Sequence, residues 1–184
     1  MGLSEPSLGR LAAYLDALAE WSRRVNLTGA RTPGDRVRLL VESVLPARAL
    51  PEPGTLLDVG SGNGSPGLVL ALLRDDLDVT LLEPRTRRWA FLREAARRTG
   101  GSRVRVLRRR HDDYPGPPVR TVTVRALALP LPELAPLLEP GGRLLILGGA
   151  PRLEGPFEEL DNSPDGAGDI RVFCRLGGIV SRET

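Results

Sequence analysis

Apolar positions in the first 50 residues recur every three or four residues. They are Leu8, Leu11, Leu15, Leu18 and Val25, with Tyr14 and Trp21 beside them. This spacing predicts an amphipathic helix of about 18 residues. Thr32 supplies a helix cap, Pro33 suits the first helical position and Asp35 suits the first turn, so a second helix is expected to run from there to about residue 50. We therefore predict a helical extension over residues 1–52 and a second unit over 53–184.

From residue 55 the pattern changes to short apolar runs separated by helical stretches. The expected strands are 55–60, 79–83, 104–108, 121–125, 143–148, 169–176 and 179–183, and the expected helices are 66–74, 86–99 and 131–138. Strands that alternate with helices indicate a mainly parallel sheet. Gly177-Gly178 is typical of a two-residue hairpin between the last two strands. The proline-rich segment 114–118 predicts no full helix, and 161–168 predicts a loop.

These elements predict an α/β, Rossmann-like fold with a seven-stranded, mainly parallel sheet that ends in an antiparallel hairpin. That arrangement resembles class I methyltransferases. The chain has 184 residues, which suits one domain with a small extension. It has no apolar run near the roughly 20 residues that span a bilayer, and its start lacks a signal-peptide core, so we expect a cytoplasmic protein with no membrane partner.

Cysteine and charge narrow the possible chemistry. With one Cys and one His, neither an intrachain disulfide nor an ordinary zinc site is expected. The net charge is +3 and all 26 basic residues are arginine. Codon bias towards GC-rich triplets explains this excess simply, although the planar guanidinium also suits phosphate groups. Charge alone does not establish a nucleic-acid partner.

A glycine-rich segment follows the first expected strand. The alternating Gly60, Gly62 and Gly64 let a ligand approach the main chain, and Pro66 then begins a helix. A dinucleotide fingerprint needs a third glycine where this chain has Ser65, so the spacing favours the D-x-G-x-G-x-G signature of S-adenosylmethionine (AdoMet) enzymes. Glu83 ends the second expected strand and suits the two ribose hydroxyls. NAD would use this acid equally.

Three absences narrow the class of methyl transfer. The sequence has no N/D-P-P-Y motif, which is typical of amino-group methylation. Cys174 lies in the expected terminal hairpin, away from the cofactor edge, which argues against a thiolate nucleophile. No clear general base is present. Guanine N7 needs none, because it attacks with a free lone pair, and catalysis would then depend on positioning and desolvation.

The sequence resembles the RsmG family, also called GidB, of bacterial 16S rRNA guanine-N7 methyltransferases. Five segments carry the resemblance, in order along the chain: W-N-x-x-x-N-L-T is approximated at 21–28, D-V-G-S-G-x-G-x-P-G is present at 58–67, L-L-E-x-x-x-K-K-x-x-F-L corresponds to 81–92, R-x-E to 110–112, and S-R-A to 124–126. The resemblance implies AdoMet as cofactor, no metal, and 16S rRNA or the small ribosomal subunit as partner.

The resemblance also implies roles for individual residues. Gly60, Gly62 and Ser65 would line the methionine and adenosine part of AdoMet, and Glu83 would hold its ribose. The pair His111 and Asp112 would flank the adenine, with Asp112 accepting from the amino group. Arg125 would lie at the reacting edge, as cofactor ligand and catalytic residue, in contact with the cofactor carboxylate or an RNA phosphate. A surface ion pair is the simpler alternative for Arg125. The run at 108–110 is a candidate contact for the rRNA backbone, together with Arg85, Arg87, Arg88 and Arg93, and a solvated run is the alternative.

Three positions depart from the family pattern. The family segment R-H-x-x-D-S corresponds to 38–43, where Leu39 replaces the histidine. Ser65 replaces a phenylalanine, and Gly148-Gly149 replaces a lysine-glycine pair. They motivate a second possible function, that of an AdoMet-binding relative with another substrate or no activity. The sequence also leaves open a nicotinamide-dependent oxidoreductase and an RNA-binding assembly protein. It does not fix the oligomeric state.

Overall fold

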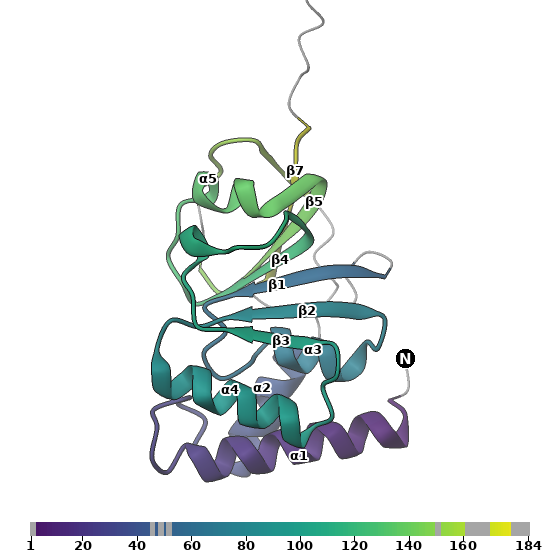
Figure 1. Ribbon diagram of the computed structural model, residues 1–184, viewed down its shortest axis with the longest axis vertical. Helices are drawn as coiled ribbons and strands as arrows, with labels where there is room; N and C mark the ends of the chain where they lie inside the picture. Colours follow the sequence, from purple (N-terminus) through teal and green to yellow (C-terminus); the bar gives the residue numbers. More distant parts are fainter. Residues whose placement is uncertain are drawn as a thin grey trace, which may run out of the picture.

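The protein is built around one seven-stranded sheet. In the computed structural model, residues 3–44, 47, 50, 53–149, 152–160 and 170–177 are described. The strands are β1 (Gly54–Val59), β2 (Leu77–Leu82), β3 (Val104–Leu107), β4 (Val119–Arg125), β5 (Leu138–Leu147), β6 (Phe157–Leu160) and β7 (Ile170–Arg175). Their order across the sheet is β3-β2-β1-β4-β5-β7-β6 (Figure 1). The order reverses between β1 and β4, and ligands of open α/β sheets bind beyond the strand ends at such a point.

The direction of the strands confirms the predicted fold class. β1 to β5 pair in parallel, whereas β7 is antiparallel to β5 and β6 is antiparallel to β7. The hairpin partner of β7 in the structure is β6, a strand that the sequence pattern did not predict. The expected strand 179–183 and the expected loop 161–168 lie outside the described residues.

The helices agree with the sequence pattern except at their ends. They are α1 (Glu5–Trp21), α2 (Pro33–Val44), α3 (Gly67–Leu73), α4 (Thr86–Arg98) and α5 (Leu131–Leu134), with 3₁₀ turns η2 (His111–Asp113) and η3 (Ala135–Leu137). Thr32 and Asp35 form a reciprocal cap at the start of α2, because each backbone N–H donates to the other's side chain. The prediction of no full helix at 114–118 is confirmed. The helix expected over 131–138 ends early, since β5 begins at Leu138.

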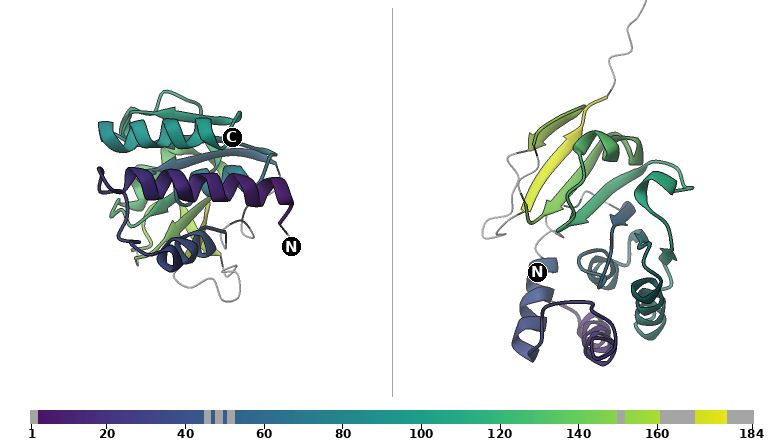
Figure 2. Two further views of the ribbon diagram at one scale, coloured as in Figure 1. Left: turned by 90° about the horizontal axis from the view of Figure 1, so that it is seen from below. Right: turned by 90° about the vertical axis from the view of Figure 1, so that its left-hand side faces the viewer.

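The helices are distributed unequally over the two faces of the sheet. Helices α1, α2, α3 and α4 gather on one face, and α5 lies on the other (Figure 2). The first face buries one apolar cluster in which Tyr14 and Leu18 of α1 pack with Leu56, Leu70 and Phe91. Each such side chain contributes about 1.5–3 kcal/mol when fully buried. The extension therefore shares its core with the sheet, and the division at residue 52 stays a prediction.

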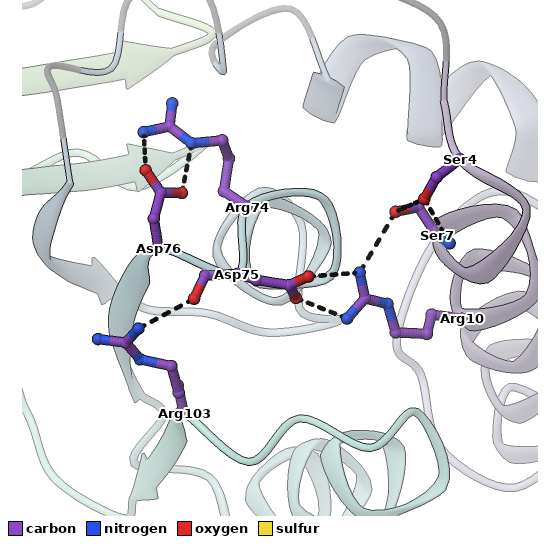
Figure 3. Close-up of polar contacts among 7 residues, drawn as sticks. All are labelled: Ser4, Ser7, Arg10, Arg74, Asp75, Asp76 and Arg103. Atoms are coloured by element: carbon purple, nitrogen blue, oxygen red, sulfur yellow. Dashed lines mark hydrogen bonds and ion pairs between the residues drawn. The ribbon is translucent and has the colours of Figure 1, made fainter.

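Polar contacts also fix α1 at the amino end of β2 (Figure 3). Arg10 donates to the Asp75 carboxylate at 2.6 Å, and Arg103 donates to the Asp75 carbonyl at 3.0 Å. These contacts lie at the edge of the sheet opposite to the strand ends where ligands of this fold class bind. In the part of the chain that the structure describes, no helix is long and apolar enough to span a membrane.

Candidate functional site

A cavity of about 500 Å³ lies beyond the carboxyl ends of the parallel strands. Four segments line most of it, and each follows one of the strands β1 to β4. They are Gly60 to Asn63 with Ser65, Glu83 to Arg85, Arg109 to His111, and Arg125 to Leu127. The position is the topological switch point between β1 and β4, where this fold class binds its ligands.

The loop after β1 takes a conformation that requires glycine. Gly60 has φ 72° and Gly64 has φ 88°, values that other residues rarely adopt. A Cβ on Gly60 would lie 3.0 Å from the Leu127 side chain, so a larger residue would also crowd the cavity wall. From α1, the buried Tyr14 hydroxyl donates to the Asn63 carbonyl at 2.9 Å. The helical extension therefore helps to hold this loop.

Glu83 lies at the end of β2 with its side chain turned towards the loop. It is 3% exposed, and its two carboxylate oxygens accept from the backbone N–H groups of Gly62 at 3.0 Å and Arg85 at 2.8 Å. A carboxylate offers about four lone-pair sites. The two that remain can accept hydroxyl donors from a ligand in the cavity.

The structure separates the two residues expected beside the adenine. His111 lines the cavity, is buried, and its Nε2 lies 2.9 Å from Oε2 of Glu133. Asp112 does not line the cavity: its side chain is 60% exposed and accepts from Arg110 at 3.3 Å. Neighbouring side chains of a 3₁₀ turn point in different directions, so only one of the two faces inward. A role for Asp112 towards adenine stays a prediction.

Arg125 lies between the glycine-rich loop and α2. Its Nη1 donates to the Ser65 hydroxyl, and its Nη2 donates to the Glu42 carboxylate at 2.8 Å. The Ser65 hydroxyl also bonds to the hydroxyl of Ser43. The structure thus brings Ser65 and Arg125 together, as expected of two ligand-facing residues. It adds Glu42 and Ser43, which the sequence pattern did not mark as site residues.

Asp58 is buried behind the loop at the end of β1. Thr123 donates to its Oδ1 at 2.6 Å, and a Cβ on Gly67 would lie 2.7 Å from its Oδ2. Only glycine therefore fits at position 67. Burial raises the pKa of Asp58 from 3.8 to about 6, and the hydrogen bond from Thr123 opposes this shift. Asp58 supports the loop from behind and does not line the cavity.

Among the described residues, no three His, Cys, Asp or Glu side chains lie close enough together to hold a metal ion. The donors at the cavity are instead backbone N–H groups, carboxylates and guanidinium groups. This donor set suits an organic ligand with hydroxyl groups and charged ends.

Comparison with known proteins agrees with this geometry. The family described as "rRNA small subunit methyltransferase G", GidB, matches residues 7–163. The chain belongs to this family. A relative named ribosomal RNA small subunit methyltransferase G in Halorhodospira halophila is 39% identical over 96% of this chain and 85% of the relative. A relative of the same name in Streptomyces avermitilis is 44% identical over 74% of this chain and 60% of the relative.

A solved structure supports the fold. Coclaurine N-methyltransferase, bound to N-methylheliamine and SAH (S-adenosylhomocysteine), superposes with a TM-score of 0.56 and 17% identity, over 72% of this chain and 42% of that one. The resemblance stated from the motifs and the assignment to the rRNA methyltransferases are confirmed. The nicotinamide alternative, weakened by Ser65, has no support from the family.

Proposed function

We propose that this chain transfers the methyl group of AdoMet to N7 of a guanine in 16S rRNA, the small-subunit rRNA. The observation that carries the proposal is the convergence of four post-strand segments on one cavity that holds both a glycine-rich loop and the buried Glu83. Membership in the rRNA small subunit methyltransferase G family supports the substrate class.

The residues at the cavity fit AdoMet. Gly60 and Gly62 present bare main chain, so the methionyl and adenosyl parts can lie against the loop. Glu83 has lone pairs left for the two ribose hydroxyls. Arg125 can hold a carboxylate, and the walls beside it include Leu127 and Leu129. When bound, AdoMet supplies an electrophilic methyl group on a sulfonium ion.

The charge around the cavity suits an RNA substrate. Arg85, Arg109 and Arg110 lie at its edge and are exposed, and we call these three residues the basic rim. Guanidinium groups bind phosphates as planar, permanently charged donors. Guanine N7 loses no proton on methylation, so the protein needs to position the base and exclude water rather than remove a proton. The cavity can do both without a general base.

Calorimetric titration with SAH and with NADH tests the cofactor part of the proposal. We expect SAH to bind and NADH not to bind. In Glu83→Gln, the amide would place an NH2 group against a backbone N–H and would lose charge-assisted bonds to the ribose. We expect SAH to bind on the order of 30-fold more weakly.

A matched control is Glu158→Gln, an exposed acid on the edge strand β6 far from the cavity in the strand order. It should bind SAH as the wild type does. Binding of NADH in place of SAH, or an unchanged SAH affinity in Glu83→Gln, would contradict the proposal.

A further inference from the structure

Four side chains join α2 to the cavity, and we call them the α2 wall. Glu42 and Ser43 belong to α2, Ser65 belongs to the glycine-rich loop, and Arg125 ends β4. Ser43 and Ser65 are 0% and 3% exposed, so their hydroxyl groups depend on each other and on protein partners rather than on bulk water. The hydrogen bonds among them join residues that lie 22 to 83 positions apart in the sequence.

The direction of the hydrogen bonds in the α2 wall follows from one contact. The Ser43 hydroxyl donates to the Leu39 carbonyl at 2.6 Å, within α2. A hydroxyl has a single proton to donate, so Ser43 must accept from Ser65. Ser65 in turn accepts from Nη1 of Arg125. The chain therefore runs from Arg125 through Ser65 and Ser43 to the backbone of α2, and each donor polarises the next.

Glu42 holds the other side of the same guanidinium. It accepts from Nη2 of Arg125 at 2.8 Å, while Ser65 takes Nη1. Arg125 lines the cavity, and its side chain is 25% exposed. Its contacts with Ser65 and Glu42 hold it in place on two sides. These contacts use two of the five N–H donors of the guanidinium. A flexible side chain with no such partners would have to be ordered when a ligand binds.

We propose that Glu42 and Ser43 are positioning residues that fix the Arg125 guanidinium for an anionic ligand group in the cavity. This inference rests on the proposed function, because it assumes that Arg125 faces the AdoMet carboxylate or an RNA phosphate. Both groups present paired anionic oxygens to the same guanidinium fork. Helix α2 would then contribute to ligand affinity although none of its own residues lines the cavity.

A double-mutant cycle between Glu42 and Arg125 tests the inference. The variants are Glu42→Gln, Arg125→Lys and the double variant, and the control is Glu158→Gln. Each is titrated with SAH and, separately, with a guanine-containing RNA oligonucleotide. Glu42 is half exposed, so Glu42→Gln should fold, and thermal unfolding checks this.

We expect Glu42→Gln to weaken one of the two ligands about fivefold, which is the usual cost of ordering one long side chain. Lysine lacks the planar fork that places one nitrogen on Ser65 and another on Glu42, so Arg125→Lys should weaken the same ligand at least as much. In the Arg125→Lys background, Glu42→Gln should add less than about twofold, because the pair acts as a unit.

The ligand that responds identifies the anionic group. A response to SAH assigns Arg125 to the carboxylate, and a response to RNA assigns it to a phosphate. Unchanged affinities for both ligands in Glu42→Gln, or additive effects in the double variant, would overturn the positioning role. A wild-type chain that binds no SAH would instead contradict the proposed function, and the inference would fall with it.

Discussion

Two sides of the cavity use arginine in opposite ways. In the α2 wall, Arg125 is mostly buried and is held by Glu42 and Ser65, which come from distant parts of the chain. On the basic rim, Arg109 and Arg110 have side chains 53% and 66% exposed, and their partners Asp113 and Asp112 are two to four residues away. The first arrangement fixes the position of one guanidinium group, whereas the second leaves two guanidinium groups in local ion pairs that are open to solvent.

The difference matters because exposed and buried charges contribute differently. Exposed local ion pairs contribute about 0–1 kcal/mol and weaken in salt. A partly buried guanidinium with fixed partners can recognise a planar anion at a defined place. On the proposed function, we expect the α2 wall to orient one anionic group and the basic rim to give a salt-sensitive attraction for the RNA backbone.

The largest effect should come from Arg125. Arg125→Ala removes the guanidinium that Ser65 and Glu42 hold in place, so we expect kcat/KM for methyl transfer to fall on the order of 100-fold. Radiolabel transfer from AdoMet to 16S rRNA measures it. Arg120→Ala, an exposed arginine near the other end of the same strand, is the matched control and should stay within about twofold. If Arg125→Ala and Arg120→Ala lowered kcat/KM equally, Arg125 would be no different from an ordinary surface arginine.

The titration of Asp58, behind the loop, should make the stability of the protein depend on pH. Its pKa is about 6 in the folded protein and 3.8 when unperturbed. Between these values the folded state binds more protons than the unfolded state, so stability falls as pH rises through the window. The free energy of unfolding is lower by ~3 kcal/mol above pH 6 for this reason, and the loss is absent below pH 4. Asp58→Asn has no such proton to lose.

Urea unfolding of both proteins at pH 4 and pH 7 measures this term. The free energy of unfolding of Asp58→Asn relative to the wild type should rise by ~3 kcal/mol over that range. Asp16→Asn, an exposed acid on α1, should change by less than about 0.5 kcal/mol. A flat difference for Asp58→Asn would mean that the carboxyl group is charged and solvated in the folded protein.

The basic rim should give the smallest and most salt-dependent effect. In the double variant Arg109→Gln/Arg110→Gln, RNA affinity at low salt should fall about tenfold, and the slope of log K against log salt should decrease by about 1–2. SAH affinity should stay within about twofold.

Fluorescence titration of an rRNA fragment at several salt concentrations measures this effect. Arg103→Gln/Arg120→Gln places the same charge change near the amino ends of β3 and β4 and serves as control. If both double variants lose the same RNA affinity, the basic rim is only part of a general positive charge.

The sequence predicted those features that depend on local pattern. The apolar runs of β1 to β5 and the glycine-rich loop are continuous in sequence, so their positions follow directly. Glu83 could be assigned because it ends a strand beside that loop. β6 was missed because Phe157-Glu158-Glu159-Leu160 is short and carries two charges, as edge strands often do.

The remaining parts of the site depend on packing between distant elements. Glu42 and Ser43 reach Ser65 and Arg125 only because α2 packs beside the loop. The family segment R-H-x-x-D-S at 38–43 includes both residues, but it does not say which side chains they contact. His111 faces inward and Asp112 outward because of how one 3₁₀ turn is rotated. Such rotations are set by tertiary packing and cannot be read from spacing.

One measurement tests the central claim most directly. The purified chain is incubated with AdoMet and 16S rRNA or small ribosomal subunits that carry no prior modification, and the rRNA nucleosides are then analysed by mass spectrometry. The account predicts new 7-methylguanosine with the wild-type chain and on the order of 100-fold less with Arg125→Ala. Methylation at another guanine atom or another base, or no methylation by a chain that binds SAH, would contradict it.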